Sequence, residues 1–401
     1  MECDNVPVFD YMKKSDCSGC SACAAVCPAG AIEMQPNSED FLYPKFCMEK
    51  CIACNKCVSF CPQINIKANS CENLSTIYAG SANEQKIVMA GSSGGIFELL
   101  ARYFFETNCF PCWIYGAVWD SDFKGVSHDC INCIGDVGRL RTSKYVQSKK
   151  KNVFCEISEK LNNDHAVMFV GAPCEVAGLK AYLGREFEKL ITVDFVCKGS
   201  TSPLFMRKYI DEIEAKAKSH VSYVNMRYKW EQMDNWIPQF IKVGFKNGKQ
   251  IMKEFYNTPI GHAFRMVQRS SCYNCRYVGF DKCSDITLGD YHGLKREDVF
   301  FNSYGTSVVV ANTVKGKMII EKIRKVGCAN LQEVSSSRIA EDNPAFFKAS
   351  TENGKRELLI SYVRKYSLEK SVKKVISKKD RLKMIIPWQI QRWILKQKRG
   401  Y

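Results

Sequence analysis

Two cysteine runs near the start of the chain have the residue types and the spacing of metal ligands. The segments "CSGCSACAAVCP" (17–28) and "CIACNKCVSFCP" (51–62) repeat one pattern, Cys-x2-Cys-x2-Cys-x3-Cys-Pro. In bacterial ferredoxins the first three thiolates of such a run hold one 4Fe–4S cluster, and the fourth binds the other cluster. A zinc or disulfide framework is the alternative for the same thiols. The pattern predicts one cluster on Cys17, Cys20, Cys23 and Cys61, and a second on Cys51, Cys54, Cys57 and Cys27.

The whole chain has the composition of a soluble multidomain protein. Its 401 residues suffice for two or three domains, and its contents of 46% hydrophobic and 25% charged residues are ordinary. The first seventeen residues contain no apolar signal segment, so the 22 cysteines are expected in a reducing cytoplasm, where they favour metal ligation. There is no run of about 18 apolar residues, so no membrane-spanning helix is expected.

Strand and helix patterns alternate after a polar linker at 67–76 and predict an α+β fold with a mixed α/β body. The segment "GSSGGIFELLARYFF" (91–105) is typical of a glycine-rich turn that opens a helix. Residues 165–183 and 190–218 each predict a buried strand, a loop and a helix. A hairpin is predicted to turn at Asn247-Gly248.

Five body segments occur in an order that resembles a known family. They are "GSSGGIFELLA", "RTSKYVQS", "VGAPCEVAGLKAYL", "VDFVCKGSTSP" and "CYNCRYVGFDKCSDITLGDYHG". The family is that of the coenzyme F420 hydrogenase/dehydrogenase beta subunits, which is also similar to plant hydroxymethyl-chlorophyll reductases and to bacterial proteins associated with polysaccharide synthesis. The resemblance covers about residues 10–345 and implies a flavin site and an iron–sulfur cluster inside the body. The domains expected are a dicluster ferredoxin domain (1–66), N-terminal and C-terminal beta-subunit regions (75–175 and 176–345) and a basic helical tail (346–401).

The segment that contains Cys272 and Cys275 supplies half of a four-cysteine site, and the resemblance supplies the other half. Cys174 in "GAPC" and Cys197 in "FVCKG" match the family's cluster positions. Each follows a predicted buried strand, and α/β sheets place their sites at the carboxyl ends of strands. We therefore expect a third 4Fe–4S cluster on these four thiolates, with Cys283 outside the set. Buried, unpaired cysteines are the alternative.

The flavin, taken as FAD, is expected beside the glycine-rich turn. Backbone N–H groups and hydroxyls there suit a pyrophosphate, although a plain loop is the alternative. The lysine of "TSKYVQS" would stabilise a reduced flavin by its charge, and a solvated surface lysine is the alternative. The segment "DITLGD" (285–290) would line the same cleft or brace the cluster loop. The predicted cofactor-binding residues are Ser92, Ser93, Gly94, Gly95, Ser143, Lys144 and Gln147, and the predicted catalytic residues are Lys144 and Tyr145.

Two further cysteine pairs have the spacing of a zinc ribbon. Cys109 and Cys112 form the first pair, and seventeen residues separate it from Cys130 and Cys133. A predicted hairpin between the pairs would place Cys112 opposite Cys130 or Ile131. Buried structural thiols are the favoured interpretation of these cysteines, and zinc is the alternative.

The positive charge of the chain is concentrated in its tail. Residues 370–401 contain eleven Lys and Arg and one Asp, a net charge of +10 out of +16 for the whole chain. Trp388, Trp393 and the neighbouring cations suit an anionic membrane surface, and a terminal helix packed on the body is the alternative. The body contains no nucleic-acid recognition motif, so nucleic acid is not an expected partner.

The sequence therefore predicts a cytoplasmic iron–sulfur flavoprotein oxidoreductase, with peripheral membrane contact through the tail as one of the two interpretations above. Electrons would pass between the ferredoxin clusters, the body cluster and FAD, which would reduce or oxidise an organic substrate or the deazaflavin F420. A redox protein or ferredoxin would be the electron partner. The alternative is a non-catalytic electron-transfer subunit of a larger redox complex.

Overall fold

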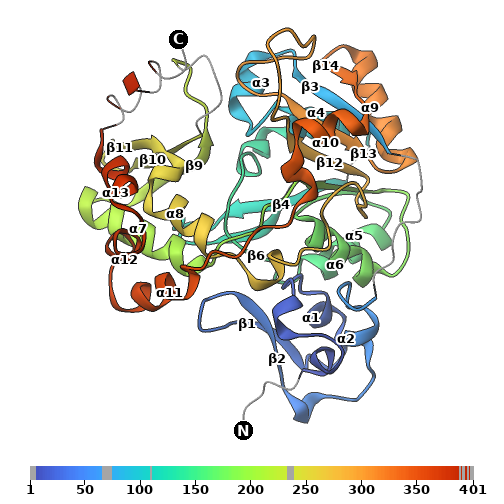
Figure 1. The fold of residues 1–401 in the computed structure, drawn as a ribbon. Coiled ribbons are helices and arrows are strands. Elements are labelled where there is room, and N and C mark those ends of the chain that lie inside the picture. The colour runs from blue at the N-terminus through green and yellow to red at the C-terminus, as the bar shows by residue number, and fades with distance from the viewer. Residues whose placement is uncertain are drawn as a thin grey trace.

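The computed structural model describes residues 6–65, 75–108, 111–232 and 239–387, and positions 390, 393, 394 and 397. Residues 6–65 form a small module at one end of the molecule (Figure 1). Its helices are α1 (Ala22–Val26) and α2 (Lys56–Ser59), and its hairpin pairs β1 (Ile32–Pro36) with β2 (Leu42–Phe46). Both cysteine runs turn through a left-handed residue before the helix, at Ser21 (φ 75°) and Asn55 (φ 54°), so the sequence repeat is also a repeat of backbone geometry.

The body is built on a nine-stranded mixed sheet in the order β14-β3-β13-β12-β8-β7-β4-β5-β6. The four neighbours β12, β8, β7 and β4 run parallel, so the loops that follow them gather at one edge of the sheet. The strands are β3 (Thr76–Ala82), β4 (Cys112–Trp119), β5 (Val126–Ile131), β6 (Ser148–Lys149), β7 (Ala166–Val170), β8 (Leu190–Phe195), β12 (Ile286–Asp290), β13 (Ser307–Ala311) and β14 (Ala329–Glu333).

Helices cover both faces of this sheet. Along β7, Met168 packs in one core with helices α4 and α9, whereas Val167 and Phe169 pack in another core with α5 and α6. This alternation is the period of two that a strand buried on both faces requires. The helices of this part are α3 (Gln85–Ala90), α4 (Ile96–Thr107), α5 (Val153–Asn162), α6 (Pro173–Leu183), α9 (Val314–Val326) and α10 (Ser336–Asp342).

A second, three-stranded sheet lies beside the first and carries the C-terminal helices (Figure 1). Its order is β11-β10-β9, and the predicted turn at Asn247-Gly248 joins β10 to β11, with Gly248 at φ +82°. The strands are β9 (Val221–Tyr228), β10 (Phe240–Phe245) and β11 (Gln250–Glu254), and the helices are α7 (Pro203–Ala217), α8 (Pro259–Met266), α11 (Arg356–Lys365), α12 (Leu368–Val375) and α13 (Lys378–Ile385).

The mixed α/β body and the helical C-terminal region agree with the fold expected from the sequence. One expected boundary does not coincide with a break in the structure. The division between residues 175 and 176 falls inside α6, and the nine-stranded sheet continues across it because β7 pairs directly with β8. In the part of the chain that the structure describes, no helix is long and apolar enough to cross a membrane.

Candidate functional site

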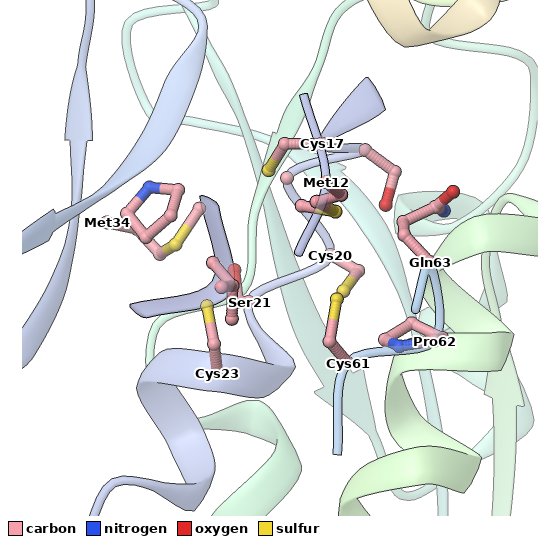
Figure 2. Close-up of a pocket in the computed structure, with 13 residues that line it drawn as sticks. Met12, Cys17, Cys20, Ser21, Cys23, Met34, Cys61, Pro62 and Gln63 are labelled. Atoms are coloured by element: carbon pink, nitrogen blue, oxygen red, sulfur yellow. The ribbon is translucent and has the colours of Figure 1, made fainter. Parts of the chain in front are cut away.

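Four cysteines from both runs line one pocket of the small module; we call them the proximal set. Figure 2 shows Cys17, Cys20, Cys23 and Cys61 around this pocket, together with Met12 and Met34. Burial raises the pKa of Cys23 well above its ordinary value, and the nearby thiols of Cys20, Cys17 and Cys61 raise it further. The fourth cysteine of the second run thus lies with the first three of the first run, as the crossed ferredoxin pattern requires.

Four further cysteines of the module, the remaining ones of the two runs, form the distal set: Cys27, Cys51, Cys54 and Cys57. The sulfur of Cys27 accepts the N–H of Ala31 at 3.2 Å. Burial raises the pKa of Cys57, with smaller contributions from the thiols of Cys27 and Cys54. Cys51 and Cys54 are exposed. This set therefore offers the module's most accessible point for electron exchange.

Three separate segments of the body bring together Cys174, Cys197, Cys272 and Cys275, which we call the body set. Cys174 begins α6 after β7, and Cys197 follows β8, the neighbouring parallel strand. Burial raises the pKa of Cys197 to about 12, with contributions from Cys272 and Cys275. Burial likewise raises the pKa of Cys174, with contributions from Cys197 and Cys272.

Backbone donors point at the sulfurs of the body set, as they do in the module. The N–H of Gly199 donates to the Cys197 sulfur at 3.3 Å, and the N–H of Ser200 donates to Cys272. Gly199 has φ +90°, and a Cβ there would lie 3.1 Å from the Cβ of Cys272, so the loop needs glycine to approach this closely. Four half-buried thiols with such donors fit the ligand shell of a 4Fe–4S cluster, whose irons would neutralise the thiolates.

The proximal and body sets are in contact through α6. A Cβ built on Gly178 would lie 2.7 Å from the Cβ of Cys20 and 3.0 Å from its sulfur. Gly178 follows Cys174 by one helical turn, so both lie on the same side of α6. Burial raises the pKa of Tyr277, and the largest charge contributions come from Cys174 and Cys20, one thiol from each set.

Charged contacts hold the module's hairpin against the body. Arg356 of α11 donates to the carboxylate of Glu39, with one distance of 3.1 Å, and Arg207 of α7 forms an ion pair with Asp40. Arg356 is buried although it is charged, so this contact is more than a solvated surface pair. The module is therefore docked in a fixed orientation, with its proximal set facing the body.

The glycine-rich loop lies between α3 and α4, and its glycines are explained by packing. A Cβ on Gly94 would lie 2.5 Å from the carbonyl oxygen of Gly80 in β3, and Gly95 caps α4 at φ +83° against Ile87. The Ser93 hydroxyl donates to the carbonyl of Thr306 at 3.1 Å. Close approach of a phosphate is thus not needed to account for Gly94 and Gly95.

Ser143 and Arg227, which come from two other segments of the chain, form hydrogen bonds with this loop. The Ser143 N–H donates to the Ser92 hydroxyl at 2.9 Å. Arg227 of β9 donates to the Asp290 carboxylate at 2.9 Å, to the Tyr145 hydroxyl at 3.1 Å and to the carbonyl of Ser92 at 2.8 Å. Segments distant in sequence thus meet at Ser92, which is the geometry expected of a cofactor or substrate site.

Two lysines lie in the segments that contact this loop. Burial lowers the pKa of Lys144 to about 7, and its ammonium donates to the carbonyls of Arg141 and Thr142. Burial also lowers the pKa of Lys229 to about 7, and its ammonium donates to the carbonyl of Val88 at 2.5 Å. Arg227 lies in β9 and Lys229 directly follows that strand, and neither was predicted from the sequence because no motif contains them.

Two regions of the chain match models of known protein families. The model of a 4Fe-4S dicluster domain matches residues 16–66, and a model of the C-terminal part of the coenzyme F420 hydrogenase/dehydrogenase beta subunits matches residues 164–337. Residues 164–337 belong to the F420 hydrogenase/dehydrogenase beta-subunit family. The resemblance inferred from the five sequence segments is confirmed.

Individual relatives cover less of the chain. One of the subunits of the F420H2 dehydrogenase of Methanosarcina mazei is 23% identical over 198 residues, which are 46% of this chain and 54% of that protein. An uncharacterized polyferredoxin-like protein of Methanocaldococcus jannaschii is 41% identical over 58 residues, which are 12% of this chain and 34% of that protein. The chain thus spans about half or less of each relative. A solved chain of the F420-reducing NiFe hydrogenase complex of Methanosarcina barkeri aligns with 75% of this chain and 90% of its own length, at 17% identity and a TM-score of 0.43.

These matches make the chain an iron–sulfur electron-transfer protein that combines a dicluster domain with a beta-subunit domain. Gln147, predicted to bind the cofactor, lies at the contact between these two domains. Its side-chain oxygen accepts the N–H of Leu42 at 2.8 Å, and its amide nitrogen lies 2.5 Å from where a Cβ on Gly19 would be. These contacts give Gln147 a role in joining the two domains, and its role in binding a cofactor stays a prediction.

The "DITLGD" segment mainly braces the beta-subunit domain. The Asp285 carboxylate accepts the N–H and the hydroxyl of Thr192, both at 2.8 Å, and the Thr287 hydroxyl donates to Asp194 at 2.5 Å. These contacts tie β12 to β8, the strand that precedes Cys197. Asp290, at the end of β12, reaches the charged site through Arg227.

The geometry contradicts the zinc hypothesis for the remaining cysteine pairs. In the β4–β5 hairpin Cys130 pairs with Tyr115, and Ile131 pairs with Ile114. Cys112 is buried with α4 on one face of the sheet, whereas Cys130 packs with α5 and α6 on the other. Two thiols on opposite faces cannot bind one ion. Cys109 lies outside the described residues, and among those that are described no three His, Cys, Asp or Glu side chains are arranged to hold a single metal ion.

Proposed function

We propose that the chain is an oxidoreductase subunit in which three 4Fe–4S clusters carry electrons between a surface partner and FAD. The contact between the proximal and body sets carries the proposal, because Cys20 packs on Gly178 one turn from Cys174. An electron that enters at the exposed distal set has successive cysteine sites to follow into the body. Clusters of this type exchange single electrons, which suits such a relay.

The buried charges around Ser92 support FAD as the further cofactor. Arg227 pairs with the Asp290 carboxylate, and Lys229 lies near both of them, so the basic groups outnumber the carboxylate among these contacts. Bound FAD would supply hydride exchange with an organic substrate or with F420, and single-electron exchange with the clusters. Ser92, Ser93, Ser143 and Lys144 are the residues proposed to hold it, and Tyr145 is proposed to orient Arg227.

Anaerobic mixing of the reconstituted protein with one donor at a time tests this function. Reduced ferredoxin is expected to reduce the flavin through the clusters, whereas reduced F420 would exchange with the flavin directly. Cys20→Ala removes a ligand of the proximal set, so it should slow flavin reduction by ferredoxin at least about a hundredfold, or about 2.7 kcal/mol on the barrier. The rate with F420 should stay unchanged. An equal ferredoxin rate in wild type and variant would exclude the relay.

A second candidate function is electron transfer without a substrate of its own. The surface near the distal set favours a protein partner, because Met48 and Ile52 are 74% and 64% exposed beside the exposed Cys51. The first relative is named as a subunit of a dehydrogenase, which suits the same role. Reduction of the clusters by a partner, with no flavin bound after reconstitution with FAD, would favour this candidate.

The basic tail is proposed to bind an anionic membrane surface. Helix α12 packs on the body through Leu368 and Val372, but in α13 Leu382 and Ile385 are 61% and 63% exposed. Trp393 is 63% exposed as well, and Trp388 lies outside the described residues. Exposed apolar side chains interleaved with Lys and Arg are the composition of interfacial helices.

Replacing Leu382 and Ile385 together by Glu is expected to weaken binding to phosphatidylserine vesicles about a hundredfold or more. Burying each side chain in the bilayer interface contributes about 1.5–3 kcal/mol. Co-sedimentation with vesicles measures the loss. The control makes the same change at Val314 and Met318, which are 61% and 55% exposed on α9. If both double variants sediment like the wild type, the tail does not bind membranes.

A further inference from the structure

Arg269 contacts one ligand of the proximal set and one of the body set. Its Nε donates to the carbonyl oxygen of Cys17 at 2.6 Å, its Nη1 to that of Leu42 at 2.9 Å, and its Nη2 to the sulfur of Cys17 at 3.6 Å. Its backbone carbonyl accepts the N–H of Cys272 at 2.9 Å. A single residue of the beta-subunit domain therefore links the two cysteine sets.

The surroundings of the guanidinium fix it in this position. Arg269 is 1% exposed, and its guanidinium carbon lies 3.9 Å from the centre of the Tyr43 ring. A Cβ on Gly19, inside the first cysteine run, would lie 2.9 Å from the same carbon. Gly19 has φ +69°, so both its backbone conformation and this contact require glycine. The site is thus built from both domains.

The buried charge of Arg269 needs a negative counterpart. Burying a guanidinium is costly unless it is paired. Its three acceptors are two carbonyl oxygens and the sulfur of Cys17, so in this group the thiolate of a cluster ligand is the anionic member. A reduced cluster carries one more negative charge than an oxidised one, so a cation at its ligand stabilises the reduced form more. Hydrogen bonds to the sulfurs also contribute to cluster potentials.

The distal set has a different kind of donor. The sulfurs of Cys27 and Cys51 accept backbone N–H groups, from Ala31 at 3.2 Å and from Ala53 at 3.4 Å. These donors are neutral. The two clusters of the dicluster domain are otherwise built on the same pattern, so Arg269 introduces an asymmetry between them.

We infer that Arg269 is a positioning residue that raises the reduction potential of the proximal cluster and so directs electrons inward from the distal cluster. The inference rests on the proposed function, since it concerns the same relay. With the charge and the sulfur hydrogen bond removed, the proximal cluster should become harder to reduce, and the electron should reside more often on the distal cluster.

Redox titration of the anaerobic, full-length protein followed by electron paramagnetic resonance tests the inference. In Arg269→Gln the ratio of reduced proximal cluster to reduced distal cluster is expected to fall at least about tenfold. This corresponds to a fall of about 59 mV in the proximal midpoint for a one-electron couple. Arg269→Lys keeps the positive charge but lacks the planar set of N–H donors of a guanidinium. Its proximal midpoint should therefore lie between those of the wild type and Arg269→Gln. The distal and body midpoints should change little.

Arg356→Gln is the matched control, because Arg356 is another buried arginine that joins the two domains without contacting a cysteine. It should leave the proximal midpoint unchanged. An unchanged midpoint in Arg269→Gln, or an equal fall in Arg356→Gln, would overturn the inference. If Arg269→Gln loses iron, Arg269→Lys decides, and a midpoint at or above the wild-type value contradicts the inference. An iron count near twelve per chain checks the three-cluster proposal separately.

Discussion

Replacing Cys275 by alanine is expected to remove about four irons from each chain and to leave about eight. Cys275 lies with Cys174, Cys197 and Cys272, all of which are buried or half-buried. Without one thiolate the proposed body cluster would lose a ligand, while the dicluster domain keeps the eight cysteines of its proximal and distal sets. Iron and sulfide analysis after anaerobic reconstitution measures the loss. Flavin reduction by ferredoxin should fall at least about a thousandfold, or about 4 kcal/mol on the barrier.

Cys283→Ala is the matched control for this prediction. Cys283 lies in the same segment and is half-buried, but its sulfur faces the carbonyl oxygen of Pro173 at 4.0 Å. Burial and then the Asp194 carboxylate raise its pKa to about 12, with no cysteine among the causes. The Cys283→Ala protein should retain about twelve irons. Loss of the same four irons from both variants would mean that the body set is assigned wrongly.

Replacing Gly178 by alanine is expected to weaken the contact between the proximal and body sets without removing iron. The new methyl group would lie 2.7 Å from the Cβ of Cys20, whose thiolate is held by its cluster. Overpacking of this kind costs about 1–3 kcal/mol, which here opposes the docking of the dicluster domain on α6. The substitution favours the helix itself by about 1 kcal/mol, so the beta-subunit domain should remain folded. Electron transfer from the proximal to the body cluster should slow at least about tenfold, as measured by freeze-quench spectroscopy.

Gly138→Ala provides the control, because the nearest atom to the added methyl group is the Arg141 Nη1, at 4.0 Å. It should leave the transfer rate unchanged. A Gly178→Ala protein with about twelve irons and the wild-type rate would show that electrons do not cross at Cys20.

The dicluster domain was predictable because its ligands are local in sequence. Each run supplies three ligands of one cluster within seven residues, from Cys17 to Cys23 and from Cys51 to Cys57. The body set joins positions as far apart as Cys174 and Cys275, and it was predicted only by combining strand ends with the family resemblance. Neighbouring parallel strands then brought Cys174 and Cys197 together, as expected.

Residues that act across the two sheets or the two domains could not be predicted. Arg227 meets Ser92 from the second sheet, and Arg269 reaches Cys17 across 252 positions of sequence. No local pattern distinguishes such an arginine from one at the surface. The zinc hypothesis was wrong for a related reason. Spacing gave the correct number of thiols, but the hairpin register and strand alternation place Cys112 and Cys130 on opposite faces of the sheet.

The central claim is a three-cluster relay that ends at a flavin, and the cofactor content of the reconstituted protein tests it most directly. Iron, acid-labile sulfide and released flavin should be measured on one anaerobic sample, per mole of chain. The account predicts about twelve irons and about one FAD. About eight irons without flavin would contradict it, because the dicluster domain would then hold every cluster and the buried charges around Ser92 would have another purpose.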